Sequence, residues 1–234
     1  MPTILITGAN RGLGLGLTRA YLQDGFQVIT ASRHSSPELE ALQNARLRIF
    51  QVDLTNDDAL RELADELSGS DIDILVNNAG TMAKPPGAES EQGVQGFGHF
   101  DRDLWRELFD INLFTPMRLA ELFVEQLARS PHGRIVTISS SLGSMGMNEY
   151  GGLYAYRASK AGVNAIMKSM SLDLAERGVI AVPLNPGWVK TRVGGPDAPM
   201  EVEESVAGMK RVIDGLQPSD SGRFWSWDGS ELPW

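Results

Sequence analysis

A chain of 234 residues, 42% hydrophobic and 22% charged, has the composition of an ordinary globular protein and the length of one large domain, residues 1–234. Its formal net charge of −9 argues against nucleic acid or an anionic membrane as a general partner. The absence of cysteine excludes disulfides and thiolate sites, and the three scattered histidines (His34, His99 and His132) lack the spacing typical of a zinc site, so we expect no metal.

The first predicted element is a short strand over residues 3–7, TILIT. This apolar run reaches glycine and arginine within a few residues, which is too early for the hydrophobic region of a secretory signal. No window of the chain approaches the roughly 18 apolar residues of a membrane span. We therefore expect a soluble cytoplasmic protein.

The segment TGANRGLG, residues 7–14, connects that strand to a helix predicted over residues 13–24. Gly8, Gly12 and Gly14 permit a tight turn, and the helix N-terminus offers free amide hydrogens to a pyrophosphate. The spacing differs from the G-x-G-x-x-G fingerprint, and no Gly-Lys-Ser/Thr follows as in a phosphate-binding P-loop. The strand-to-helix setting favours a dinucleotide cradle over a glycine-rich turn without a ligand.

The end of the second predicted strand, residues 26–31, indicates which dinucleotide would bind. An acidic side chain at this place would hydrogen-bond the ribose hydroxyls of NAD, but Ser32 and Arg33 occupy it. Arg33 could pair with a 2′-phosphate, and Arg11 in the glycine turn offers a second guanidinium. Two basic residues near one predicted phosphate favour NADP(H), while a solvated loop arginine is the alternative for each.

Further strands are predicted over residues 47–53, 72–77, 134–139, 180–185 and 223–227, and further helices over 57–67, 103–128, 154–177 and 201–214. The near-continuous hydrophobicity of the strands is typical of strands covered on both faces. Alternating strands and helices predict an α/β fold, a doubly wound Rossmann domain with a seven-stranded, mostly parallel sheet. Residues 83–101 form a polar, glycine-rich connection, which we expect over the site or the surface.

The stretch YAYRASK, residues 154–160, contains two tyrosines and one lysine in a predicted helix. Tyr156 and Lys160 are four positions apart and share one helix face, whereas Tyr154 lies about 200° around the helix from Tyr156 and faces away. A free phenol titrates near ~10, and a nearby ammonium lowers that value. The spacing predicts a proton donor assisted by a lysine, with a tyrosine packed at an exposed helix edge as the alternative.

With TGANRGLG, NNAG at 77–80, ISSS at 138–141, YRASK at 156–160 and NPGWVKT at 185–191 in this order, the chain resembles the short-chain dehydrogenase/reductase family over nearly its whole length. Residues 139–174 and the ending GRFWSWDGSELPW look like the branch of C-factor-like proteins and sniffer-like carbonyl reductases. The resemblance implies NADP(H)-dependent reduction of a small ketone or aldehyde to an alcohol, and a homodimer or homotetramer. A signalling or NADP(H)-sensing protein with little catalysis, and an epimerase or dehydratase, remain as alternatives.

The resemblance also implies roles for individual residues. Tyr156 would donate a proton to the carbonyl oxygen, and Lys160 would hold the nicotinamide ribose. Ser140, in a run of three serines, would polarise the carbonyl, and Asn112 would help to hold a water for proton relay. The implied cofactor contacts are Gly8, Asn10, Arg11, Gly12, Leu13, Gly14, Ser32, Arg33, Asp53, Leu54, Asn78, Ala79, Gly80, Tyr156, Lys160, Pro186, Gly187, Val189 and Thr191.

Substrate recognition is expected in the segments that these motifs leave out, residues 83–101, 142–153 and 192–205. Met145, Met147, Trp188 and Met200 could line an apolar pocket, because methionine adapts to varied shapes. Ordinary packing is an equal alternative for each of them. The three tryptophans of the ending WSWDGSELPW are expected in the core or in a subunit contact.

Overall fold

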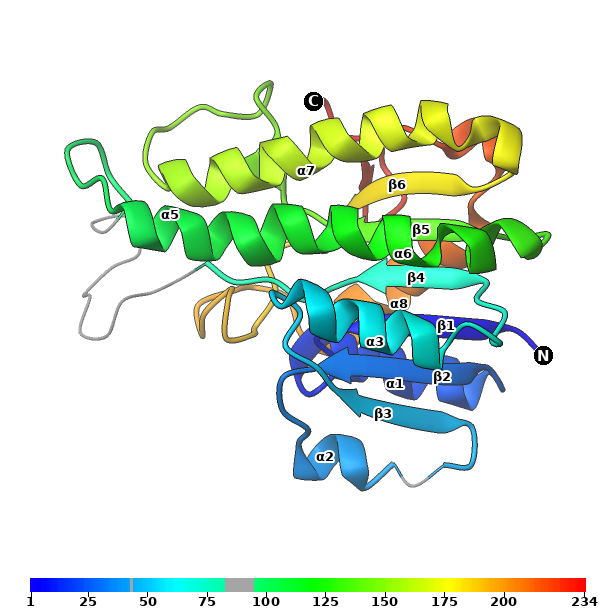
Figure 1. Ribbon diagram of the computed structural model, residues 1–234. Helices are drawn as coiled ribbons and strands as arrows, with labels where there is room; N and C mark the ends of the chain where they lie inside the picture. The colour runs from blue at the N-terminus through cyan, green and yellow to red at the C-terminus, as the bar shows by residue number, and fades with distance from the viewer. Residues whose placement is uncertain (43, 83–94) are drawn as a thin grey trace.

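The structure is a computed structural model that describes residues 1–42, 44–82 and 95–234. Within these residues, seven parallel strands form one sheet with the order β3-β2-β1-β4-β5-β6-β7 (Figure 1). The strands are β1 (Thr3–Thr7), β2 (Gln27–Ser32), β3 (Leu47–Gln51), β4 (Ile74–Asn77), β5 (Arg134–Ile138), β6 (Ile180–Asn185) and β7 (Trp225–Ser226). This order confirms the predicted doubly wound α/β fold, because the chain reverses direction across the sheet between β3 and β4.

Helices cover both faces of the sheet (Figure 1). One face carries α3 (Asp57–Glu66), α6 (Thr115–Arg129) and α7 (Tyr154–Asp173), and the other carries α1 (Gly12–Gln23) and α8 (Val202–Gly215). In β1, Ile4 and Ile6 pack with α1 and α8 while Leu5 packs with the opposite layer, as the two-residue period of a strand requires. Burial on both faces accounts for the hydrophobic runs of the inner strands.

The edge strand β3 differs from that expectation. Its burial alternates irregularly, and Ile49 is 36% exposed, so β3 is not covered on both faces. The last predicted strand, residues 223–227, shortens to the two residues of β7. Both strands lie at the edges of the sheet, where a neighbour on one side only supports the pairing.

The helix predicted over residues 103–128 consists of three consecutive segments. They are α5 (Arg102–Phe109), a π-helical segment η1 (Asp110–Phe114) and α6. The helix predicted over residues 154–177 ends as α7 at Asp173 and continues in a 3₁₀ turn, η3 (Ala175–Arg177), before Gly178 at φ +71°. The sequence pattern does not predict the short segments α2 (Pro37–Glu40), η2 (Ser141–Gly143) and η4 (Pro218–Asp220).

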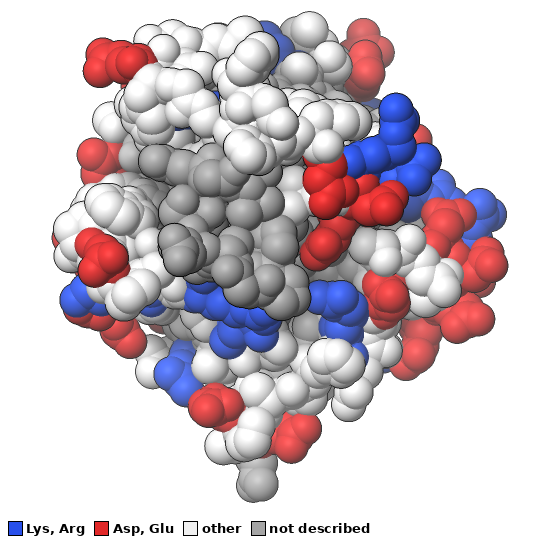
Figure 2. Space-filling view, turned by 90° about the vertical axis from the view of Figure 1, so that its left-hand side faces the viewer, with Lys and Arg blue, Asp and Glu red and all other residues white. Residues whose placement is uncertain are grey.

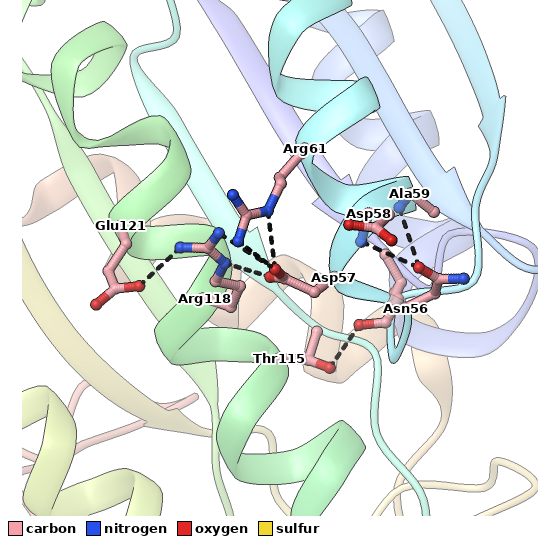
Figure 3. Close-up of polar contacts among 9 residues, drawn as sticks. Asn56, Asp57, Asp58, Ala59, Arg61, Thr115, Arg118 and Glu121 are labelled. Atoms are coloured by element: carbon pink, nitrogen blue, oxygen red, sulfur yellow. Dashed lines mark hydrogen bonds and ion pairs between the residues drawn. The ribbon is translucent and has the colours of Figure 1, made fainter.

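Polar contacts tie α6 to the start of α3 (Figure 3). Arg118 of α6 forms ion pairs with Asp57 and Glu121, and Asp57 also pairs with Arg61 of its own helix. The Thr115 hydroxyl lies 2.8 Å from the carbonyl oxygens of both Leu54 and Asp110. These contacts anchor the π segment and α6 to the connection that follows β3.

Candidate active site

The glycine turn after β1 has no room for a side chain at Gly8 or Gly14. Gly8 and Gly12 have φ angles of +67° and +53°, which favour glycine. A Cβ on Gly8 would lie 2.9 Å from Ala79 Cα, and one on Gly14 would lie 2.4 Å from the Gly8 carbonyl oxygen. The first backbone amides of α1 have no acceptor within the helix and can donate hydrogen bonds to an anion. They belong to Gly12, Leu13 and Gly14.

The turn after β4 supports the glycine turn from below. Asn78 Nδ2 donates to the carbonyl oxygens of Thr7 (2.8 Å) and Gly8 (3.1 Å). The Thr7 hydroxyl in turn accepts hydrogen bonds from the amides of Asn78 and Ala79, each at 3.0 Å. Thr7 is the first residue of the motif TGANRGLG, but it was not among the expected cofactor contacts. The side chain of Asn78 therefore holds the cradle together.

Three arginines gather beside this turn. The pKa of Arg11 is lowered by partial burial and then by the charges of Arg192 and Arg33, which places the three guanidinium groups within electrostatic reach. Figure 2 looks onto the edge where the strands end and shows a group of Lys and Arg side chains across the lower half of this face. Arg11 and Arg33 were expected here, but Arg192, which follows the last family motif, was not.

The other residues expected on the adenosine side are engaged with the protein itself. The Ser32 hydroxyl donates to the His34 carbonyl at 3.0 Å. Asp53 accepts hydrogen bonds from the amide and hydroxyl of Thr55, and these bonds, with a smaller contribution from Arg33, lower the pKa of its carboxyl group. Leu54 is 3% exposed and its side chain belongs to the core, as does part of Leu13, while Asn10 is half-buried.

The two tyrosines of YAYRASK have different surroundings. Tyr156 is 6% exposed, and Lys160 Nζ lies 5.8 Å from the centroid of its ring, whereas Tyr154 is 44% exposed. Lys160 is buried, and its Nζ donates to the carbonyl oxygen of Ile138 at the end of β5 at 2.8 Å. Burial lowers the pKa of Lys160 to about 8.

The three serines after β5 also differ in their burial and hydrogen bonds. Ser139 is 2% exposed, and its hydroxyl donates to Asn164 Oδ1 at 2.6 Å in the interior. Ser140 is half-buried, and its Oγ accepts the amide hydrogen of Leu142 at 3.2 Å. The amide of Ser141 donates to Asn185 Oδ1 at 3.0 Å. Ser139 therefore points into the interior, whereas Ser140 and Ser141 are both half-buried at the end of the strand.

Asn112 lies in the π segment and is 1% exposed. Its side-chain amide accepts from the amide of Thr81 at 2.9 Å and donates to the carbonyl of Thr81 at 2.8 Å and to Ser159 Oγ at 3.1 Å. A Cβ on Gly80 would lie 3.1 Å from Asn112 Oδ1 and 3.6 Å from Lys160 Nζ. Gly80 therefore lies between the amide of Asn112 and the ammonium of Lys160.

The loop after β6 closes the other side of the site. Gly187 has φ +82°, and a Cβ there would lie 3.0 Å from both Met200 Cε and the ring of Trp227. Val189 is 3% exposed, and Pro186 accepts a hydrogen bond from Ser205 Oγ. A Cβ on Gly12 would contact the methyl group of Thr191 at 3.5 Å, so this loop reaches the glycine turn.

Three of the four residues considered for a substrate pocket are exposed. Met145 is 77% exposed, Trp188 58% and Met147 42%, so none of these three lies in the core, while Met200 is half-buried against Gly187. Of the loop expected over residues 83–101, residues 83–94 lie outside the described residues.

Over residues 1–42, 44–82 and 95–234, no cluster of three or more His, Cys, Asp or Glu side chains could hold a metal. In the same ranges no helix is both long and apolar enough to cross a membrane.

Comparison with known proteins identifies the family. The sequence profile of the short chain dehydrogenase family matches residues 2–201, and the chain belongs to this family. C-signal of Myxococcus xanthus is 39% identical over 179 residues, which cover 75% of this chain and 100% of that protein. These matches confirm the resemblance to the family.

Two solved structures extend the similarity over the whole chain. The carbonyl reductase Sniffer of D. melanogaster has a TM-score of 0.91 and 33% sequence identity, with 100% of both chains covered. A carbonyl reductase from Pseudomonas aeruginosa PAO1, in complex with NADP, has a TM-score of 0.86 and 33% identity, again with 100% of both chains covered. With C-signal, they confirm the expected C-factor-like and sniffer-like branch.

Proposed function

We propose that this chain is an NADPH-dependent carbonyl reductase that converts a ketone or aldehyde to an alcohol and runs in reverse on secondary alcohols. The observation that carries the proposal is the buried pair of Tyr156 and Lys160, with the ammonium 5.8 Å from the phenol ring and tied to the end of β5 beside Ser140. Similarity to carbonyl reductases over 100% of the chain supports the same reaction class.

The residues at the ends of β1, β2 and β6 suit an NADP cofactor. The side-chain-free turn at Gly8 and Gly14 and the open amides of α1 suit a pyrophosphate. Arg11, Arg33 and Arg192 supply concentrated positive charge for a 2′-phosphate, which NAD lacks. When bound, NADPH would supply the hydride.

The proton chemistry falls to the residues of α7 and β5. Tyr156 would donate its phenol proton to the substrate oxygen, and the charge of Lys160 would stabilise the phenolate left behind. Because Ser140 Oγ accepts the amide hydrogen of Leu142, its own hydrogen can be directed to the substrate oxygen, where it would stabilise developing negative charge. Asn112 orders the Thr81 backbone beside Lys160, the side from which a relayed proton would return.

A second candidate is a signalling or NADP(H)-sensing protein, which the 39% identity to C-signal favours. The two functions differ in whether NADPH is consumed. An epimerase or dehydratase on the same fold would use its dinucleotide without net consumption, so the stoichiometry of NADPH loss separates a reductase from both alternatives.

The test is the loss of nicotinamide absorbance when the purified protein is mixed with NADPH and a panel of ketones and aldehydes. We expect one NADPH consumed per alcohol formed, and a fall of at least about 10²-fold in kcat for Tyr156→Phe, because proton donation contributes about 10²–10⁴-fold. The matched control is Tyr154→Phe on the exposed face of the same helix, which should retain its activity. NADPH binding without consumption would favour the sensing function over the reductase. Retained activity in Tyr156→Phe would show that Tyr156 is not the proton donor.

A further inference from the structure

The N-terminus of α7, the helix that carries Tyr156 and Lys160, begins in an unusual way. Its N-cap position is Leu153, in the left-handed conformation with φ +54°, and Gly152 before it has φ +86°. Leucine has no polar side-chain atom, so it cannot accept a hydrogen bond from the first amides of the helix as Ser, Thr, Asn or Asp would. Those amides need acceptors from elsewhere, because they have none within the helix.

Gln95, far away in the sequence, supplies such acceptors. Its backbone carbonyl accepts from the amide of Tyr154, the first residue of α7, at 3.2 Å. Its side-chain Oε1 accepts from the amide of Tyr156, the third residue, at 2.9 Å. Its Nε2 donates to the carbonyl of Met82, beyond the end of β4, at 2.8 Å, and Gln95 is 3% exposed. One buried glutamine thus binds the first turn of α7 to the chain that follows β4.

We propose that Gln95 is a positioning residue that caps α7 from outside and holds Tyr156 in the geometry required for proton donation. This inference rests on the proposed function. The first turn of a helix frays when its amides lack acceptors, and Tyr156 lies in that turn, whereas Lys160 lies a full turn deeper. Loss of the cap would therefore move the phenol relative to the ammonium, and small misplacements of reacting groups cost rate steeply.

The uncharged amide of Gln95 also matters for the proton chemistry of Tyr156. Gln95→Glu keeps an oxygen that can accept from the amide of Tyr156, but it adds a negative charge beside the tyrosine and removes the donor to Met82. A neighbouring anion disfavours a phenolate. The substitution is therefore expected to preserve the helix end while raising the pH at which Tyr156 becomes an effective base for alcohol oxidation.

The first experiment measures the helix end without any use of activity. Hydrogen exchange at the backbone amide of Tyr156 is followed by NMR in the wild type, in Gln95→Met and in Gln126→Met, a matched control at a buried glutamine of α6. We expect exchange at Tyr156 to be at least about tenfold faster in Gln95→Met and unchanged in Gln126→Met. Unchanged exchange in Gln95→Met would overturn the proposal, even if the wild type proved to be no reductase.

The second experiment measures catalysis in the same proteins. For Gln95→Met we expect kcat to fall about tenfold while the Kd of NADPH stays within about twofold, and for Gln95→Glu we expect the acidic limb of the oxidation profile to rise by about half a pH unit or more. A kcat of Gln95→Met within twofold of the wild type would overturn the proposal. So would equal losses of kcat and NADPH affinity in the Gln95 and Gln126 variants, because a general loss of structure would then explain both.

Discussion

The ammonium group of Lys160 lies inside the protein, where it donates to the carbonyl oxygen of Ile138. Burial without compensating charge disfavours the protonated form, so the pKa falls from 10.5 to about 8. The lysine is thus mostly protonated at neutral pH, when its charge can assist Tyr156, but it is held at a cost to the folded state. A functional group that weakens the fold is a common compromise at active sites.

The cost predicts a dependence of stability on pH. Below about pH 8, Lys160 is protonated in both the folded and the unfolded state, and folding carries the full cost of burying its charge. Between about pH 8 and 10.5 the folded state has lost this proton while the unfolded state still holds it. The free energy of unfolding therefore rises with pH in this range. Lys160→Met removes this dependence. At pH 7 we expect the variant to be about 1–2 kcal/mol more stable than the wild type, after loss of the bond to Ile138.

Denaturant unfolding at about pH 7 and about pH 10 checks this expectation. The advantage of the variant should fall by about 2–3 kcal/mol between these two pH values and therefore change sign. A difference that is independent of pH would mean that the pKa of Lys160 in the folded protein is not lowered.

The arginines predict cofactor choice. We expect Arg33→Ala and Arg192→Ala each to weaken NADPH binding about tenfold or more and to leave NADH binding within about twofold, because a charge-assisted bond to the 2′-phosphate contributes about 1.5–3 kcal/mol. Calorimetric titration with both dinucleotides checks this expectation. Arg106→Ala, an exposed arginine paired with Asp103 on α5, is the control. Equal losses for the two dinucleotides would remove the arginines from the phosphate site.

At the scale of elements, the unit formed by β1, the glycine turn and α1 makes a sharp prediction. In Gly14→Ala the new methyl group would lie 2.4 Å from the Gly8 carbonyl oxygen and 2.5 Å from Asn78 Nδ2, so the turn must open. We expect a loss of about 1–3 kcal/mol in stability and a loss of NADPH binding. The matched control is Gly69→Ala, where nothing lies within 4 Å of the added carbon.

Thermal unfolding and dinucleotide titration of the two glycine variants check this prediction. The control should behave as the wild type does in both measurements. Normal NADPH binding by Gly14→Ala would show that the turn is not the cradle of the cofactor.

The local sequence pattern predicts the inner strands and α1 well. Buried parallel strands are almost entirely apolar, and α1 starts at a glycine turn. It does not predict the π segment Asp110–Phe114, since the hydrophobic period hardly changes when one turn gains a residue. It also overestimates β7 and the cover over β3, because partners across the sheet, and not the local sequence, decide what lies at an edge.

Some residues of the candidate site could likewise be predicted from the sequence, and others could not. Tyr156, Lys160 and the glycine turn were expected here because their spacing along the chain reflects their geometry. Gln95 could not be expected, because its contacts to α7 depend on how distant segments meet. Arg192 carries no local signal either, since an arginine after a loop motif is usually a solvated side chain.

For the whole molecule, the parallel sheet explains why these distant residues meet. The carboxyl ends of β1, β2, β4, β5 and β6 lie at one edge, and the glycine turn, the arginines, Ser140 and the loop after β6 all follow those ends (Figure 1). α7 crosses the same edge with its N-terminus and adds Tyr156 and Lys160. A single edge thus carries the glycine turn together with Tyr156 and Lys160, which is the arrangement that the proposed hydride transfer with proton donation requires.

The central claim is that this edge transfers hydride from NADPH to a carbonyl carbon. The most direct measurement uses NADPH that carries deuterium in both C4 positions of the dihydronicotinamide ring and follows the label in the alcohol by mass spectrometry. We predict one deuterium on the carbinol carbon with the wild-type protein and no labelled alcohol above background with Tyr156→Phe. Alcohol formed without the label, or no alcohol from any carbonyl compound while NADPH is bound, would contradict the claim.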